Sequence, residues 1–229
     1  MDSFDRPVPL QCHLKDPPIC PGDGRLQKLA VRLLGRLTDH ERVALKLWLP
    51  RCLPEMRLTT SCSGTDSPKL VWKSLAAAVD SELGVKLCVR SLWACEKSKV
   101  KQRFLNAVWP DLPTVHNRVE DLEQLEGDFG NAHYSGFPCT SASMLNPHAN
   151  TKLNLNCVRD GAEETGSVFQ ALMRALRTRG APLSMLILEN VASLARGTNL
   201  DEVLQCLSKA GFSTKVWHLN PRDWGSVQN

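Results

Sequence analysis

The sequence predicts an α/β protein with a doubly wound, mostly parallel sheet and an N-terminal helical extension. From Met56 onward, β-prone runs alternate with amphipathic helical segments, which is the rhythm of strand–helix–strand units. The apolar run 186–188 stops abruptly at Glu189 and Asn190, as a buried strand does at the functional edge of such a sheet. A glycine-containing turn at 63–66 joins another β-prone run to the start of a helix, which is a third sign of this fold class.

Two domains are predicted, an extension over residues 1–55 and a sheet domain over residues 56–229. Prolines and glycines punctuate the start of the extension, which indicates a flexible arm. Two helices with leucines at helical spacing follow, the second beginning at a capping box of Thr38 and Glu41 and ending at Pro50. These helices form either a hairpin packed on the sheet domain or a separate partner-binding module.

The boundaries within the sheet domain follow from capping and turn residues. Ser67 and Pro68 supply an N-cap and a proline in the first helical turn, Gly84 stops that helix, and Gly211 follows the end of the last helix. The polar segment 144–165 lacks periodicity and is predicted to be a loop. The predicted elements are β-prone runs at 58–62, 85–94, 114–115, 183–188 and 212–219, and helices at 67–83, 97–108, 167–176 and 201–209.

Composition excludes several classes of protein. The nine cysteines include no Cys-x-x-Cys pair and no histidine at ligand spacing, so no structural zinc site is expected. The chain opens on polar residues, and no apolar run approaches the roughly 20 residues of a membrane span, so we expect a soluble nuclear or cytoplasmic protein. The net charge of +4 is compatible with a polyanionic partner but does not by itself indicate one.

The segment 136–143 contains the candidate nucleophile. Pro138 fixes its own φ angle and pushes Phe137 toward an extended conformation, so the backbone entering Cys139 is stiff. A thiol on such a turn after a strand faces the functional edge of the sheet rather than the core. Glu189 and Asn190, at the end of a later strand, can then place an acid beside this nucleophile. The alternative is that Cys139 is a buried structural thiol, the commonest state of a free cysteine.

These two segments resemble the motifs of the DNA cytosine-5 methyltransferase family, which has a Rossmann-like methyltransferase core. The family pattern Gly-Phe-Pro-Cys-Gln-x-Phe-Ser is matched at 136–139 and Ser143, with Thr140 and Ala142 in place of Gln and Phe. The family's Glu-Asn-Val is matched at 189–191, and the segment 220–228 resembles its Asn-x-x-x-Tyr-Gly-x-Pro-Gln, with Trp and Val replacing Tyr and Pro. The resemblance covers roughly residues 56–228.

The resemblance implies a covalent mechanism acting on a cytosine turned out of the double helix. Cys139 would add to carbon 6 of the ring, and Glu189 would hydrogen-bond or protonate the ring nitrogen. Asn190 would tie the Pro-Cys turn to the strand that carries Glu189. The loop after Cys139 would close over the base as a lid.

The resemblance also implies S-adenosylmethionine as the cofactor. Its contacts would come from the turn after the first strand, where Asp66 stands at the position of a second family glycine, and from Glu96, which would bind the ribose hydroxyls. Trp93 would shield an adenine edge, although a tryptophan near a strand end is usually part of the core. Asn117 or Asp121 would meet the adenine ring. The implied cofactor-binding residues are Ser63, Gly64, Thr65, Asp66, Glu96, Asp121 and Pro138.

The implied partner is double-stranded DNA, although a branch of the family acts on transfer RNA, and no metal or membrane partner is expected. The family's target-recognition region and final helix would follow Gln228 and are not contained in these 229 residues. Two other classes therefore stay open: a non-catalytic remnant or fragment with a binding role, and a doubly wound enzyme that methylates a small molecule or a protein.

Overall fold

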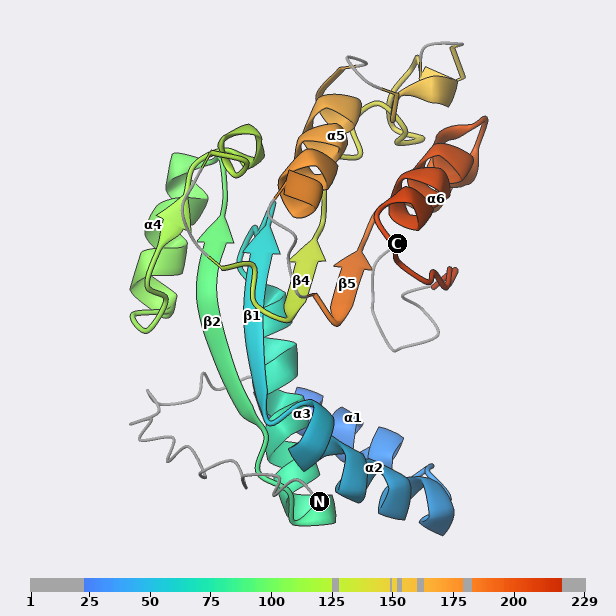
Figure 1. Cartoon of the computed structure of the whole chain (residues 1–229). Coiled ribbons are helices and arrows are strands. Elements are labelled where there is room, and N and C mark those ends of the chain that lie inside the picture. Colours follow the sequence, from blue (N-terminus) through green and yellow to red (C-terminus); the bar gives the residue numbers. More distant parts are fainter. Residues whose placement is uncertain are drawn as a thin grey trace, which may run out of the picture. The chain divides into compact units, whose positions relative to one another are not determined.

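The computed structural model describes residues 23–124, 128–148, 150–151, 154–159, 163–178 and 183–219 (Figure 1). The flexible arm, predicted over residues 1–24, lies outside the described residues except for residues 23–24, which belong to the first helix, α1 (Asp23–Leu34). The segment 220–228 also lies outside the described residues.

Five strands form one sheet in the order β3-β2-β1-β4-β5, and the α/β fold class is confirmed. The pairs β1–β4, β2–β3 and β4–β5 are parallel, with Ser61 opposite Ser135 and Ser135 opposite Leu188. In this order, β5 is the last strand at one edge. The strands are β1 (Glu55–Ser61), β2 (Cys88–Cys95), β3 (Val115–His116), β4 (Ala132–Ser135) and β5 (Met185–Leu188).

The helices begin and end close to the predicted capping residues. Thr38 and Glu41 form the capping box, which is confirmed, and Gly84 takes a left-handed φ of 66° directly after α3. The helix that starts at Thr38 continues through Pro50 for two more residues. The remaining helices are α2 (Asp39–Cys52), α3 (Ser67–Leu83), α4 (Lys99–Val108), α5 (Glu163–Thr178) and α6 (Asn199–Lys209), with 3-10 turns η1 (Val119–Asp121), η2 (Asn154–Asn156) and η3 (Ala192–Ala195).

The described chain divides into two compact units. One contains residues up to Met56 together with 69–90, and the other contains 57–68 together with 91–219. Within the first unit, the Arg42 guanidinium donates to Leu34 O and Glu82 O, both at 3.2 Å, and so joins α2 to the end of α1 and to α3. The boundary between residues 55 and 56 stays a prediction.

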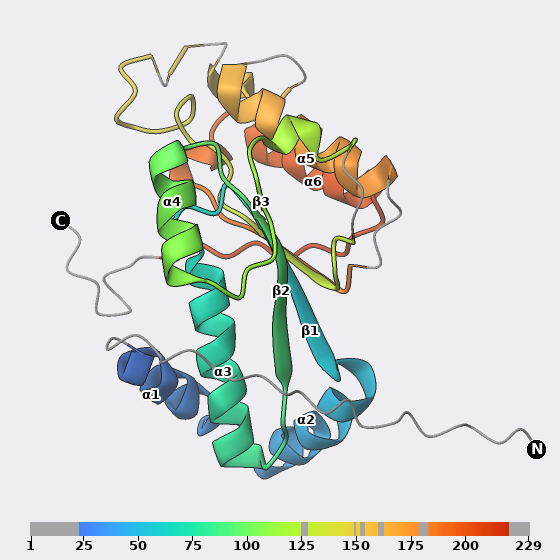
Figure 2. The same ribbon diagram turned by 90° about the vertical axis from the view of Figure 1, so that its left-hand side faces the viewer.

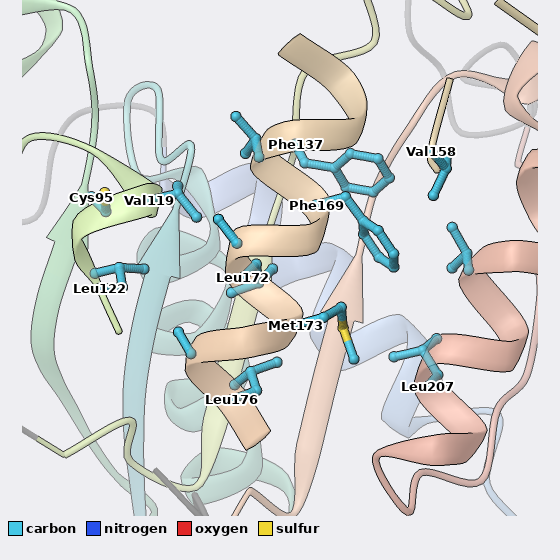
Figure 3. Packing of buried hydrophobic residues seen from close by; sticks show 14 of the residues in the cluster. Cys95, Val119, Leu122, Phe137, Val158, Phe169, Leu172, Met173, Leu176 and Leu207 are labelled. Carbon is cyan, nitrogen blue, oxygen red and sulfur yellow. The ribbon is translucent and has the colours of Figure 1, made fainter. Parts of the chain in front are cut away.

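The core of the second unit lies between one face of the sheet and the helices α5 and α6 (Figure 2). Figure 3 shows Phe169, Leu172, Met173 and Leu176 of α5 at the centre of this cluster, and none of the four is more than 5% exposed. Successive side chains of a strand point to opposite faces. Ala94 of β2 accordingly packs in a second, smaller cluster with residues of α4 and the turn after it, on the other face.

A buried histidine supports the middle of the sheet. Thr59 Oγ1 donates to Phe129 O at 2.8 Å, so it must accept from His133 Nδ1, which lies 2.8 Å away. His133 Nε2 then accepts from Ser61 Oγ at 3.0 Å. The ring is therefore neutral, and its burial lowers the pKa of His133 to about 3.

Two predicted features differ from the structure. Residues 212–219 were predicted to form a strand, but they form no regular element, and Val216, Trp217 and Leu219 are exposed. This segment takes part in no ladder of the five-stranded sheet. The predicted loop at 144–165 also contains η2 and two fully buried residues, Cys157 and Val158.

Candidate functional site

The candidate site lies at the carboxyl ends of β1, β4 and β5. The strand order reverses between β1 and β4, because β1 leads to β2 on one side and β4 leads to β5 on the other. Such a switch point is where doubly wound folds bind their ligands. The Pro-Cys turn follows β4, and the Glu-Asn pair follows β5.

The Pro-Cys turn is a compact, internally bonded structure. Ala142 N and Ser143 N both donate to Cys139 O, at 3.0 and 2.8 Å. Phe137 is buried and packs on Phe169, with ring centroids 5.3 Å apart, so it anchors the turn in the core. Cys139 is only partly buried, and its thiol is free. A partly exposed thiol beside a buried anchor suits a nucleophile better than a core residue.

Asn190 ties this turn to the end of β5. Its Nδ2 donates to Phe137 O at 3.0 Å, and its Oδ1 accepts from Val191 N at 3.0 Å. Glu189 N extends the ladder by donating to Ser135 O at 2.9 Å. The predicted link between the two motifs is therefore present as a hydrogen bond.

The Glu189 carboxylate lies beside the backbone that leads to Cys139. A Cβ atom added to Gly136 would stand 3.3 Å from Glu189 Oε2 and 3.9 Å from the Tyr134 hydroxyl. Burial and the nearby Glu189 charge raise the pKa of Tyr134, so the phenol keeps its proton at neutral pH. Tyr134 is the only tyrosine of the chain. Its place near Glu189 was not predicted, because only pairing of β4 with β5 brings the two residues together.

Two further side chains hold the Pro-Cys turn. Ser193 Oγ of η3 donates to Ala142 O at 2.6 Å, and Ser141 N donates to Thr165 Oγ1 near the start of α5 at 3.4 Å. Both contacts join segments more than 20 residues apart, and no sequence motif marks them.

The turn after β1 takes an unusual backbone path. Cys62, Gly64 and Asp66 all have φ between 52° and 59°, the left-handed region that favours glycine. A Cβ at Gly64 would meet no atom within 4 Å, so the backbone there is open to a ligand. Asp66 is 1% exposed, which places its side chain inside the turn. Thr65 is exposed.

Ser63 and Glu96 join this turn to the end of β2. Ser63 Oγ donates to Cys95 O at 3.2 Å and accepts from Cys95 N at 3.1 Å. Its hydroxyl therefore binds the backbone at the end of β2. Glu96 Oε2 accepts from Gly64 N, and its Oε1 accepts from Ser98 N, both at 2.8 Å. Each carboxylate oxygen keeps a further lone pair, so Glu96 can still accept from a hydroxyl.

Of the residues expected around an adenine ring, two lie at the surface and one lies in the core. Asp121 of η1 is exposed, and Asn117 Oδ1 accepts from Gln102 at 3.1 Å. Trp93 is buried, its Nε1 donates to Asp128 O at 2.9 Å, and its ring packs on Phe129. Trp93 is therefore a core residue, which is the alternative that its place near a strand end suggested.

The other thiols near the site are poor nucleophiles. Burial and the charges of nearby carboxylates raise the pKa of Cys62 to about 12, and burial also raises the pKa of Cys95. No helix in the described part of the chain is long and apolar enough to cross a membrane. Among the same residues, no group of three or more His, Cys, Asp or Glu side chains is placed to hold a metal ion.

No protein-family model matches the sequence. The chain is 23% identical over 181 residues to DNA (cytosine-5-)-methyltransferase DMT5 of Cryptococcus neoformans var. grubii, a match that covers 74% of this chain and 7% of that protein. The chain thus spans a small part of the length of this relative.

Two solved structures resemble the fold. One is assigned as a class I S-adenosylmethionine-dependent methyltransferase from Listeria monocytogenes, with a TM-score of 0.44, 11% identity, and coverage of 82% of this chain and 59% of that chain. The other is the methyltransferase CalH in complex with SAH, with a TM-score of 0.30, 15% identity, and coverage of 73% and 39%. These likenesses concern the fold alone. The curated relative is named a DNA methyltransferase, and both solved structures are described as methyltransferases.

Proposed function

We propose that this chain is the core of a DNA methyltransferase that transfers a methyl group to carbon 5 of cytosine, with Cys139 as the covalent nucleophile. The observation that carries the proposal is the hydrogen bond from Asn190 Nδ2 to Phe137 O, 3.0 Å long. It joins the segments that carry Cys139 and Glu189 at the ends of two paired strands. The similarity to a cytosine-5 methyltransferase supports the choice of substrate.

In the proposed reaction the protein activates an unreactive ring carbon. Cys139 Sγ bonds to carbon 6, and the electron pair of the ring's double bond makes carbon 5 nucleophilic. When bound, S-adenosylmethionine supplies an electrophilic methyl group. Loss of the proton from carbon 5 then expels the thiolate from carbon 6 and restores the double bond.

Glu189 is proposed to stabilise the ring while the thiolate is attached. Its carboxyl group, in the protonated form, would donate to the ring nitrogen on which negative charge develops. The neighbouring Tyr134 hydroxyl, which keeps its proton, provides a second donor near this carboxylate. Asn190 acts on the backbone of the Pro-Cys turn and so fixes the position of the nucleophile relative to Glu189.

The turn after β1 is proposed to bind the cofactor through its backbone. Gly64 and Thr65 are accessible, and the free lone pairs of Glu96 suit the ribose hydroxyls. Ser63 and Asp66 would shape the turn from inside, because both side chains are buried. We also propose that Asp121 and Pro138 contact the cofactor.

Covalent capture tests the nucleophile directly. The chain is incubated with S-adenosylmethionine and a duplex that contains 5-fluorocytosine, and the adduct is measured by denaturing mass spectrometry. Since fluorine at carbon 5 cannot leave as a cation, the adduct accumulates on Cys139. Cys139→Ser should abolish the adduct, and Cys206→Ser, at a half-buried free thiol of α6, should leave it unchanged. An adduct that persists in Cys139→Ser would remove this residue from the mechanism. A single-stranded RNA of the same sequence, in a parallel reaction, distinguishes the RNA-modifying alternative.

A binding protein without turnover is the second candidate, favoured by Asp66 at a left-handed position of the cofactor turn. Calorimetric titration with S-adenosylmethionine and with SAH tests cofactor binding without any nucleic acid. Glu96→Gln keeps one of the two acceptors for backbone N–H groups, so hydrogen exchange at the amides of Gly64 and Ser98 is measured in the same variant. A loss of binding with unchanged exchange assigns the carboxylate to the ligand, and a loss of binding with faster exchange assigns Glu96 to support of the turn.

A further inference from the structure

The second half of the segment that follows Cys139 is fixed to the protein rather than free to move as a lid. Cys157 and Val158 have no exposed surface, and η2 precedes them directly. Gly166 of α5 would place a Cβ 2.2 Å from Cys157 O, so the helix backbone itself packs against this segment. Of the expected lid, the exposed part in the described residues lies around Leu145 and His148.

Three consecutive residues at the start of α6 hold η2 in place. Gly197 has a left-handed φ of 62°, and a Cβ there would stand 2.2 Å from Leu155 O, so only glycine allows this approach. Thr198 N donates to Leu155 O at 3.1 Å. Asn199, which is 1% exposed, accepts from Val158 N at 3.1 Å and donates to Asn154 O at 3.0 Å.

A series of asparagine side chains continues from Asn199 to the nucleophile turn. Asn154 Nδ2 donates to His148 O at 2.7 Å. His148 N donates to Asn146 Oδ1 at 2.9 Å, and Asn146 Nδ2 donates to Thr140 O at 3.1 Å. Thr140 is the residue directly after Cys139. We call Asn146, Asn154 and Asn199 the asparagine relay.

The chemistry of the amide group explains why asparagine occupies positions 146 and 199, whereas Asn154 uses only its Nδ2 and leaves Oδ1 buried without a hydrogen bond among the described residues. A carboxamide both donates and accepts, so one side chain can bind a backbone N–H and a backbone carbonyl of different segments. Aspartate lacks the donor, and leucine lacks both groups. Buried backbone groups without such partners would be costly, so the relay fixes the path of the loop.

We propose that Asn199 is a positioning residue that, through Asn154 and Asn146, holds the turn carrying Cys139 in one arrangement. The consequence for catalysis rests on the proposed function, because it concerns attack of Cys139 on a base. The structural consequence does not rest on the proposed function. In the protein without ligands, the relay sets the mobility of the turn and the access of reagents to the Cys139 thiol.

Two measurements on the ligand-free chain test the relay. One is hydrogen exchange at the amides of Ala142 and Ser143, which donate to Cys139 O and report on the turn. The other is the rate at which iodoacetamide alkylates Cys139, followed by peptide mass spectrometry. Asn199→Ala and Asn146→Ala should each speed exchange about tenfold, as loss of one net hydrogen bond predicts. Alkylation of Cys139 should also become faster in both variants.

Arg159→Ala is the matched control, because Arg159 Nε joins the same segment to Glu202 of α6 at 2.9 Å without belonging to the relay. It should leave both rates unchanged. Asn146 is only partly buried, so Asn146→Ala keeps the proposal testable if Asn199→Ala fails to fold. The proposal is wrong if Asn146→Ala leaves both rates at the original values, or if Arg159→Ala raises them as much.

The catalytic part has a separate readout. With 5-fluorocytosine DNA, Asn146→Ala should slow adduct formation several-fold while the dissociation constant for SAH stays the same. If the original chain forms no adduct but the exchange and alkylation results hold, the proposed function fails and the relay stands. If the original chain forms the adduct and Asn146→Ala forms it at the same rate, the relay has no part in positioning Cys139.

Discussion

The buried histidine of β4 makes the stability of this fold depend on pH in a window that can be calculated. Burial lowers the pKa of His133 to about 3, whereas a histidine in the unfolded chain titrates near 6.5. The folded state therefore stays neutral where the unfolded state binds a proton. The stability that neutral His133 contributes is fully present above pH 6.5. It is lost as the pH falls from 6.5 toward 3, at about 1.4 kcal/mol per pH unit.

At pH 5.0 this loss amounts to about 2 kcal/mol of unfolding free energy. His133→Gln removes the titration while keeping hydrogen-bonding groups for Thr59 and Ser61. Urea denaturation at pH 7.5 and 5.0 gives the decrease in unfolding free energy of the original chain and of the variant. The carboxylates contribute equally to the decrease in both proteins. The original chain should lose about 2 kcal/mol more than the variant. Equal declines would show that His133 is not held neutral by burial.

Two further substitutions, one of them with a matched control, test the packing of the sheet domain. Gly130→Ala places a Cβ 2.1 Å from Arg57 O at a left-handed φ of 69°, so it should lower the unfolding free energy by about 1–3 kcal/mol. Gly24→Ala, in α1 with nothing within 4 Å, should be neutral or slightly stabilising in the same urea titration, and equal losses in the two variants would contradict the strain argument. Phe169→Ala removes a fully buried ring from the contact with Phe137, with an expected loss of about 3–5 kcal/mol and faster alkylation of Cys139. Thermal denaturation and the iodoacetamide assay measure the two effects, and a stability loss below about 1 kcal/mol would mean that this core repacks freely.

Local chemistry made much of the fold predictable. The capping box at Thr38 and the glycine after α3 act within a few residues of where they stand, so their boundaries could be placed from the sequence. The proximity of the Pro-Cys turn to Glu189 and Asn190 was also predictable, because parallel strands bring their carboxyl ends to one edge of the sheet, whereas the link made by Asn190 was implied by the family resemblance.

Features that depend on distant partners were not predictable. The residues next to Trp93 in the sequence do not indicate whether its ring faces a ligand or the core. Its ring packs on Phe129, 36 residues later, and this contact could not be predicted from the local sequence. The segment 154–158 resembles a polar loop until Gly197 and Asn199 pack against it. Residues 212–219 have the composition of a strand, but composition does not decide whether a segment pairs, and this one joins no ladder of the described sheet.

The position of β5 in the sheet has a consequence for handling the isolated chain. Among the described residues this strand is the last at one edge of the sheet, consists of Met, Leu, Ile and Leu, and leaves Ile187 39% exposed. Natural edge strands usually carry lysine, proline or a bulge that prevents pairing with another molecule, and the four residues of β5 contain no lysine or proline. We therefore expect edge-to-edge self-association at high protein concentration, visible as a sedimentation coefficient that rises with loading. Ile187→Lys should keep the chain monodisperse without touching the Pro-Cys turn.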